Sequence, residues 1–293
     1  VAKVTGLIWA ASFLAKRIRK GDEITLVKRF FRPVFHFADR KKKENTFRSM
    51  IGYFLPLYGP LVMALFVLKQ PDMGTAGMIL LFPLLLYVLA GLPLFEILLG
   101  VGGAIVTFAI LVIAEPYRMD RVVVLWDPFS YAANRGYQTV QSLIAVGSGG
   151  LFGQSVGEGM SKFLYLPEQY TDFAYAVFSQ EFGFIGSVFV LLLYLVFLLA
   201  GFSAARKLKE TYAALLVYGL TMLISVQGIV NIAMVIGCFP VTGIPLPFIS
   251  YGGSSLIMNI ISVALIYGTT VQSLRETDLE ERKRRIAQME GRG

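Results

Sequence analysis

The sequence predicts an all-α polytopic membrane protein with about seven transmembrane helices. A mean hydropathy of +0.65 and a hydrophobic content of 56% are too high for an ordinary soluble domain. Charged residues make up only 16% of the chain, and the apolar runs are nearly free of them. Such segregation is expected in a bilayer, because a charged side chain at its centre costs about 2.5–3.5 kcal/mol on insertion scales.

The apolar runs define the predicted spans of a single membrane domain, 1–293. The first run is short, and the second contains two prolines, which neighbouring helices can accommodate within a membrane. Outside the spans lie a basic loop at 21–49, a long polar loop at 115–172 and a charged tail at 275–293, which is predicted to be a solvated helix. The predicted spans are 1–16, 51–68, 76–90, 94–114, 173–202, 212–239 and 249–267.

Three basic clusters predict the orientation of these spans. They lie at 16–20, 206–209 and 275–285, and the positive-inside rule places them on the cytoplasmic side. Alternation of the spans then places the loop 115–172 on the extracytoplasmic face. The loop 21–49 is predicted to be cytoplasmic and to face solvent or anionic headgroups, with a partner-binding or lipid-sensing element as the alternative.

Composition also excludes several kinds of site. The net charge of +8 is attributed to loops beside anionic lipid rather than to nucleic-acid binding, because the sequence has no soluble basic domain. Cys238 is the single cysteine, so no disulfide can form within the chain. His36 is the single histidine, which rules out a His-rich metal cluster.

Three polar features share the predicted extracytoplasmic face: a turn with Asp72, the long loop, and the Pro- and Gly-rich stretch 239–255. This stretch, which includes Thr242 and Ser250, must have non-helical backbone at membrane depth. Lipid cannot satisfy such backbone, so it must be buried in protein or line a wet cavity. We predict a substrate cavity here, with a re-entrant turn that only packs the bundle as the alternative.

The long loop carries candidate catalytic groups at its two ends. Asp172 directly precedes a predicted helix, so it is either an N-cap, worth about 1 kcal/mol, or a general base at the membrane surface. Lys162, Arg118 and Arg121 could hold an anionic group, and Glu168 lies close to Asp172 in the sequence. The Gly-rich stretch 147–153 could cradle phosphate but lacks a P-loop ending, so loop flexibility is the preferred interpretation.

A few polar residues lie inside apolar runs. Glu181 is placed within the fifth predicted span, where we expect it to bond to another helix. It lies about 180° around a helix from Asp172, so the two are not predicted to form a catalytic carboxylate pair. Gln227 and Asn231 are one turn apart and are predicted to join neighbouring helices.

Taken together, these motifs resemble the SEDS family (shape, elongation, division and sporulation), whose members are of the FtsW, RodA and SpoVE types. The family's members have about ten transmembrane helices, so this chain is expected to begin near the fourth. A fragment is also suggested by Val1, which is not an initiator Met. The residues that carry the resemblance cover nearly the whole chain in the family's order: 70–75, 115–118, 136–142, 147–150, 165–173 and 240–255.

The resemblance implies a peptidoglycan glycosyltransferase that polymerises lipid II at the outer face of the bacterial cytoplasmic membrane. It implies an inverting transfer that releases undecaprenyl pyrophosphate. The implied partners are lipid II, a class B penicillin-binding protein, other divisome or elongasome membrane proteins and membrane lipids, without nucleic acid. No cofactor is firmly implied, and a divalent cation, Mg or Mn, is the one candidate. The family's essential carboxylate falls on Asp172, and its other matching positions are Lys3, Arg118, Arg121, Lys162 and Glu168.

Two other functions stay open at this point, a lipid II flippase and a non-catalytic scaffold of the wall-synthesis complex. Broken helices of the kind predicted at 239–255 also occur in transporters. The candidate polar groups gather on one face instead of lining a path across the membrane, which favours the enzyme. The subtype also stays open, because Thr242 resembles elongation and sporulation types whereas 115–118 and 126–128 resemble division types.

Overall fold

The computed structural model describes residues 1–19, 57–70, 72–113, 115–154 and 167–290. Within these ranges the regular secondary structure is entirely helical. The predicted basic loop 21–49 and the candidate residue Lys162 lie outside the described residues.

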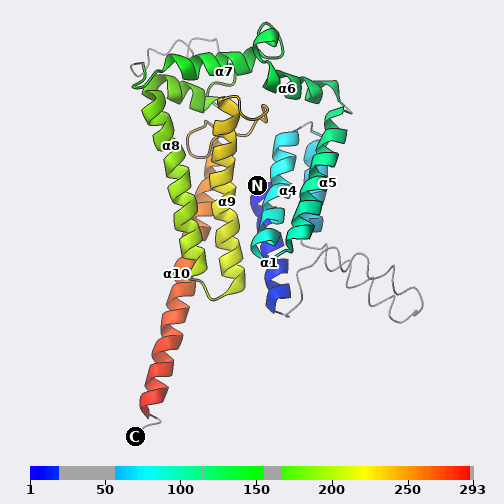
Figure 1. Ribbon diagram of the computed structural model, residues 1–293. Helices are drawn as coiled ribbons and strands as arrows, with labels where there is room; N and C mark the ends of the chain where they lie inside the picture. Colours follow the sequence, from blue (N-terminus) through cyan, green and yellow to red (C-terminus); the bar gives the residue numbers. More distant parts are fainter. Residues whose placement is uncertain (20–56, 71, 114, 155–166, 291–293) are drawn as a thin grey trace, which may run out of the picture.

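The helices form a bundle that is covered at one end (Figure 1). α9 lies at its centre and contacts α1, α4, α8 and α10. The bundle helices are α1 (Ala2–Arg19), Leu57–Leu68, α4 (Met73–Leu89), α5 (Leu94–Ile113), α8 (Ala174–Arg206), α9 (Thr211–Val235) and α10 (Gly253–Glu290). Three short helices lie across one end, which we call the capped end: α6 (Pro116–Trp126), η1 (Phe129–Tyr131) and α7 (Tyr137–Ser148).

The composition of these helices confirms the predicted fold class, an all-α polytopic membrane protein. Helices α8, α9 and α10 are long and apolar enough to cross a membrane, and α9 is the most buried of the three. Leu57–Leu68, α4 and the first part of α5 are shorter apolar helices. Apolar side chains of α1, α4, α8 and α9 form the main hydrophobic core.

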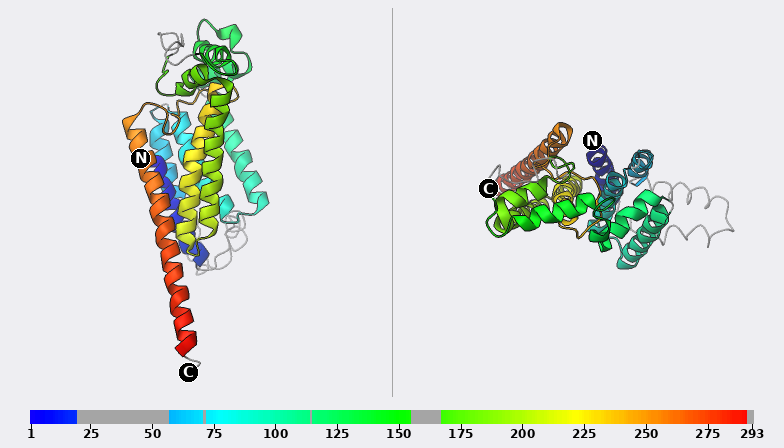
Figure 2. Two further views of the ribbon diagram at one scale, coloured as in Figure 1. Left: turned by 90° about the vertical axis from the view of Figure 1, so that its left-hand side faces the viewer. Right: turned by 90° about the horizontal axis from the view of Figure 1, so that it is seen from above.

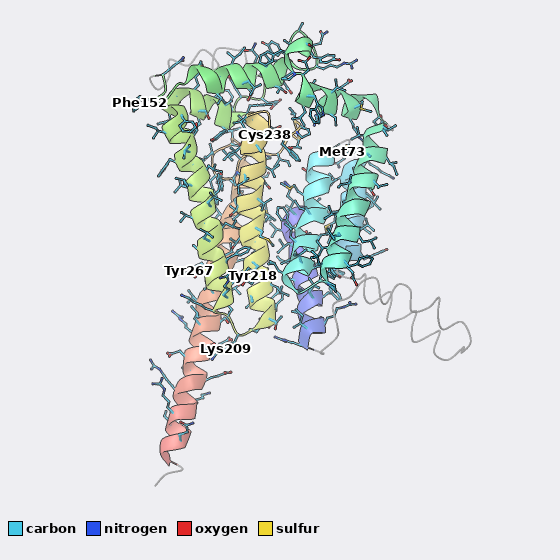
Figure 3. The ribbon with its side chains drawn as sticks, viewed as in Figure 1. Met73, Phe152, Lys209, Tyr218, Cys238 and Tyr267 are labelled. Atoms are coloured by element: carbon cyan, nitrogen blue, oxygen red, sulfur yellow. The ribbon has the colours of Figure 1, made fainter. Side chains whose placement is uncertain are left out.

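Basic residues gather at the end opposite the capped end. Arg19 of α1 forms an ion pair with Glu210, the residue that caps the N-terminus of α9. This pair brings two of the basic clusters together, and the third lies on α10, which extends beyond the bundle at the same end (Figure 2). Met73 and Cys238 lie at the capped end and Lys209 at the other (Figure 3). The three predicted basic clusters therefore lie at one end, while Arg118, Arg121 and Arg135 lie at the capped end.

Several predicted boundaries were wrong. The last predicted span ends too early, because α10 runs unbroken from Gly253 to Glu290 through the tail, which is helical as predicted. The long polar loop contains α6, η1 and α7. α9 ends four residues earlier than predicted because Gly237 takes a left-handed conformation, φ 73°, and the Cys238 N–H bonds back to Ala233 O at 2.8 Å, as in a common helix C-cap.

The fifth predicted span is broken at Gly183 (φ 66°, ψ −165°), where α8 changes direction. The Gly-rich loop supplies the hydrogen bonds that the break removes, since Phe184 N–H donates to Gly150 O at 2.8 Å. A Cβ on Gly153 would lie 2.0 Å from Glu181 O. Gly149 and Gly153 are therefore needed for close backbone packing, and flexibility was the wrong interpretation for these two, whereas a Cβ on Gly147 or Gly150 would meet no atom within 4 Å.

Candidate active site at the capped end

The residues 236–252, between α9 and α10, form an irregular segment at the capped end, and we call it the 236–252 segment. Side chains from three helices bond to its backbone carbonyls, as membrane burial requires. The bonds are Arg121 Nη1 to Val241 O (2.6 Å), Asn231 Nδ2 to Ile244 O (2.7 Å), Gln227 Nε2 to Pro245 O (2.9 Å) and Tyr194 Oη to Pro247 O (2.6 Å). Gln227 and Asn231 thus bond to this segment, and Gln227 also joins α9 to α1, as predicted, by accepting a hydrogen bond from Lys3 Nζ.

Asp172 lies beside the 236–252 segment. Its Oδ2 would be 3.4 Å from a Cβ built on Gly243, which has a left-handed φ of 69°. Its backbone carbonyl accepts a hydrogen bond from Asn231 Nδ2 at 2.7 Å. The N-cap of α8 is Phe173, which has no side-chain capping bond. The N-cap interpretation of Asp172 is therefore wrong, and its carboxylate faces the segment instead.

Two further bonds join the stretch before α8 to the same segment. Ser250 Oγ donates to Thr171 O at 2.5 Å and accepts from Leu246 N–H at 2.7 Å. Tyr251 N–H donates to Tyr170 O at 2.7 Å. Because the Ser250 hydroxyl makes both bonds, the structure gives it a bridging role, and substrate contact by this side chain stays a prediction.

Ser250→Ala is expected to lower the free energy of unfolding by about 1–3 kcal/mol, because the Leu246 N–H loses its acceptor and Thr171 O its donor. Thermal unfolding in detergent measures the change. Ser254→Ala is the matched control, since Ser254 is exposed at the start of α10. Equal melting temperatures for the two variants would contradict the bridging role.

Charges of both signs surround Asp172. Partial burial, together with the carboxylates of Glu168 and Asp72, raises the pKa of Asp172, and the Arg121 guanidinium opposes this rise. Asp72 caps α4 by accepting from Thr75 N–H at 2.9 Å. Lys3 interacts electrostatically with Asp72, and its Nζ donates to Gln227 Oε1 at 3.1 Å. Electrostatic interactions therefore connect Lys3 of α1, through Asp72 and Asp172, to Arg121 of α6.

A small cavity of about 70 Å³, which we call the α4 cavity, lies between α4, α5, α6 and the 236–252 segment. Arg118 and Arg121 supply its positive charge. Thr242 lines it where α4 touches the segment: a Cβ on Gly74 would lie 2.2 Å from Thr242 O. The cavity is lined by Met73, Gly74, Val112, Arg118, Arg121, Val122, Phe239, Pro240, Val241 and Thr242.

The remaining candidates lie elsewhere. Glu168 is exposed, and its carboxylate accepts from the Thr171 hydroxyl at 2.7 Å. Glu181 is not deep within a span, because it directly precedes the break at Gly183 near the capped end. Tyr194 and Gly243 were missed in the sequence. The only signal for Tyr194 was a hydroxyl in the apolar run 184–200, which also contains Ser187.

The described residues contain no group of three or more His, Cys, Asp or Glu side chains that could hold a metal ion. Asp72 and Asp172 are near enough to interact electrostatically. One or two carboxylates together with substrate phosphates are a common way to bind Mg²⁺. Asp72 is therefore the candidate ligand beside Asp172 for a cation that arrives with a phosphate, and such a cation stays a prediction.

Comparison with known proteins finds relatives that all belong to one family. A family model described as a cell cycle protein, FTSW_RODA_SPOVE, matches residues 1–274. Stage V sporulation protein E of Bacillus subtilis is 38% identical over 235 residues, which cover 78% of this chain and 63% of that protein. The probable peptidoglycan glycosyltransferase FtsW of Saccharophagus degradans is 35% identical over 250 residues, covering 83% and 64%.

Two solved structures are also similar. One chain comes from a peptidoglycan synthase complex studied for its coordination of polymerization and crosslinking; it has a TM-score of 0.61 and 27% identity, over 76% of this chain and 62% of that one. A mutant of the rod shape determining protein RodA from Thermus thermophilus has a TM-score of 0.51 and 27% identity, over 75% and 57%. The chain spans less than two thirds of the length of each of these four relatives.

Proposed function

The chain belongs to the FtsW/RodA/SpoVE family of cell cycle proteins, and from this membership we propose that it is a peptidoglycan glycosyltransferase that polymerises lipid II. The observation that carries the proposal is the placement of the Asp172 carboxylate against Gly243, under the influence of Arg121. A carboxylate under the influence of a guanidinium suits a reaction in which a hydroxyl loses its proton and a diphosphate leaves.

In this proposal Asp172 is the general base. It accepts the proton of a sugar 4-hydroxyl while the oxygen of that hydroxyl forms a bond to an anomeric carbon. The bond from this carbon to the diphosphate oxygen breaks at the same time, so the linkage inverts and undecaprenyl pyrophosphate leaves. A single displacement of this kind needs one base and no carboxylate nucleophile.

Arg118 and Arg121 would stabilise the leaving diphosphate from the α4 cavity. Both guanidiniums lie on α6, and Arg121 is oriented by its bond to Val241 O. Apolar neighbours such as Met73 and Val112 lower the local dielectric constant, which strengthens the attraction between these charges and a phosphate. A divalent cation, Mg or Mn, held by Asp72 together with the diphosphate would add charge stabilisation when bound and leave Asp172 to act as the base.

The proposal also specifies a membrane location and protein partners. We place the protein in the bacterial cytoplasmic membrane with its capped end outside, supported by the basic residues at the opposite end. Lipid II would enter from the membrane. A class B penicillin-binding protein is the proposed partner, supported by the likeness to a chain of a peptidoglycan synthase complex, along with other divisome or elongasome proteins.

The pH dependence of polymerisation tests the role of Asp172. Activity requires the ionised carboxylate, so it falls as the pH falls through the pKa of Asp172, which is raised above its ordinary value of 3.8. Arg121→Gln removes the group that lowers this pKa and is expected to shift the acidic limb of kcat/KM to higher pH. Glu168→Gln removes a carboxylate that raises it and is expected to shift the limb to lower pH. Shifts in the same direction for both variants would contradict the assignment.

A further inference from the structure

A second cavity lies on the other side of the Arg121 contact, between α6, α7 and the 236–252 segment, and we call it the α7 cavity. Its volume is about 130 Å³. It shares Arg121 and Phe239–Val241 with the α4 cavity, so the two cavities are neighbours. Its remaining lining comes from α6 and from the start of α7: Asp120, Val124, Leu125, Arg135, Gln138 and Thr139.

Two of the polar side chains of the α7 cavity, and the backbone that carries the others, are held in place before any ligand binds. Arg135 forms an ion pair with Asp120. The turn that carries Arg135 is fixed at Gly136, where a Cβ would lie 2.5 Å from Pro128 O. α7 in turn is attached to the end of α9 through the Ser142 hydroxyl, which donates to Val235 O at 2.7 Å. Such preorganisation lowers the entropy cost of binding.

The charges distinguish the two cavities. The α4 cavity is lined by two arginines without a carboxylate, which suits a diphosphate. The α7 cavity is lined by two arginines as well, Arg121 and Arg135, but Asp120 pairs with Arg135 and offsets one of the two charges, so an anion gains less there. The α7 cavity is lined by an ion pair, an amide and a hydroxyl, which offer hydrogen-bond donors and acceptors beside apolar side chains. These polar residues are Asp120, Arg135, Gln138 and Thr139. This combination suits a ligand with many neutral hydroxyl and amide groups.

We propose that the α7 cavity binds a saccharide unit of the glycan strand, next to the two sugars that react. The proposal rests on the proposed function, because it assigns a second subsite to the same enzyme. With the diphosphate in the α4 cavity, the adjoining α7 cavity would hold a further part of the same glycan. Such a subsite would keep the strand bound between successive transfers.

Binding of a lipid-free glycan tests the proposal without any need for catalysis. The probe is a tetrasaccharide of alternating N-acetylglucosamine and N-acetylmuramic acid, titrated calorimetrically into the purified chain in nanodiscs. Gln138→Ala is expected to weaken binding about three- to tenfold, as for the loss of one or two hydrogen bonds. Gln141→Ala is the matched control, because it lies one turn further along α7 and does not line the cavity.

Asp120→Asn is the second variant; it unpairs Arg135 and is also expected to weaken tetrasaccharide binding. Thermal unfolding shows which variants are folded. The absence of saturable binding to the wild-type chain, or equal affinities for Gln138→Ala and Gln141→Ala, would overturn the subsite. Loss of inorganic pyrophosphate binding in Gln138→Ala, with tetrasaccharide binding intact, would make the cavity an anion site and also overturn it.

The outcome can be separated from that of the proposed function. Tetrasaccharide binding that depends on Gln138, in a protein that makes no polymer from lipid II, would sink the glycosyltransferase proposal and leave the saccharide site standing. Polymer formation without tetrasaccharide binding would support the glycosyltransferase proposal and overturn the saccharide site. Where both hold, Gln138→Ala is expected to shorten the glycan strands, read as product length on a gel.

Discussion

Asp172→Asn is expected to lower the rate of glycan polymerisation by about 10²–10⁴-fold, the usual contribution of a general base. The amide has the shape of the carboxylate but cannot accept the proton of the sugar hydroxyl. The fold should survive, because Asn231 bonds to the backbone carbonyl of Asp172 and not to its side chain. The assay is polymer formation from lipid II by the purified protein, reconstituted with its proposed transpeptidase partner.

Asp127→Asn is the control for this experiment, because it makes the same chemical change at the capped end. Asp127 is exposed between α6 and η1, and its carboxylate accepts from Ser130 N–H at 3.1 Å. Normal polymer yield from Asp172→Asn would contradict the role of the base. Translocation of labelled lipid II across liposomes by a wild-type protein that makes no polymer would favour a flippase instead.

The sequence was sufficient to predict the membrane class and the irregular segment beside Asp172. Runs of apolar residues with charges between them predict helices that cross a membrane, and α4, α5 and α9 follow these runs to within a few residues at most ends. Pro and Gly at 239–255 correctly predicted irregular backbone, because such residues interrupt a helix wherever they gather. Asp172 and Arg121 then act on one another across this segment.

The break in α8 could not have been predicted from local sequence. Gly183 lies in a run that has the hydropathy of a span, and a single glycine in a helix is tolerated at a cost of about 1 kcal/mol. The break depends on the loop at 149–154, whose backbone bonds to the two ends that the break leaves. This is a tertiary effect, and it also explains why Glu181 lies near the capped end rather than within the membrane.

The hydrogen bonds from the helices to the 236–252 segment also could not have been predicted from the sequence. Tyr194, Gln227 and Asn231 lie in apolar runs, where joining another helix is the common role of a polar side chain. Their partners are carbonyls of the 236–252 segment, and these partners depend on how that segment folds back between α8 and α9. Periodicity predicts which face of a helix a residue shares, but not the irregular backbone that meets that face.

Gly74→Ala is expected to destabilise the protein by about 1–3 kcal/mol and to reduce polymerisation by about 10²-fold. The new Cβ would lie 2.2 Å from Thr242 O and 3.0 Å from Thr242 C, so the backbone at this point must shift. Thr242 lies between Val241, which Arg121 bonds, and Gly243, which Asp172 faces. The shift would separate the carboxylate from the guanidinium, and a displacement of about 1 Å can cost 10²-fold in rate.

Gly77→Ala should have the opposite effect on stability. It lies one turn further along α4, and a Cβ there meets no atom within 4 Å. Removing a glycine from a helix interior stabilises it by about 0.5–1 kcal/mol, because the unfolded chain loses conformational freedom. Thermal unfolding and polymer yield, measured for both variants, separate the contact at Gly74 from a general effect on α4. Equal stability and activity of Gly74→Ala and Gly77→Ala would contradict this prediction. The close approach of α4 to Thr242 would then not be needed to position Arg121 relative to Asp172.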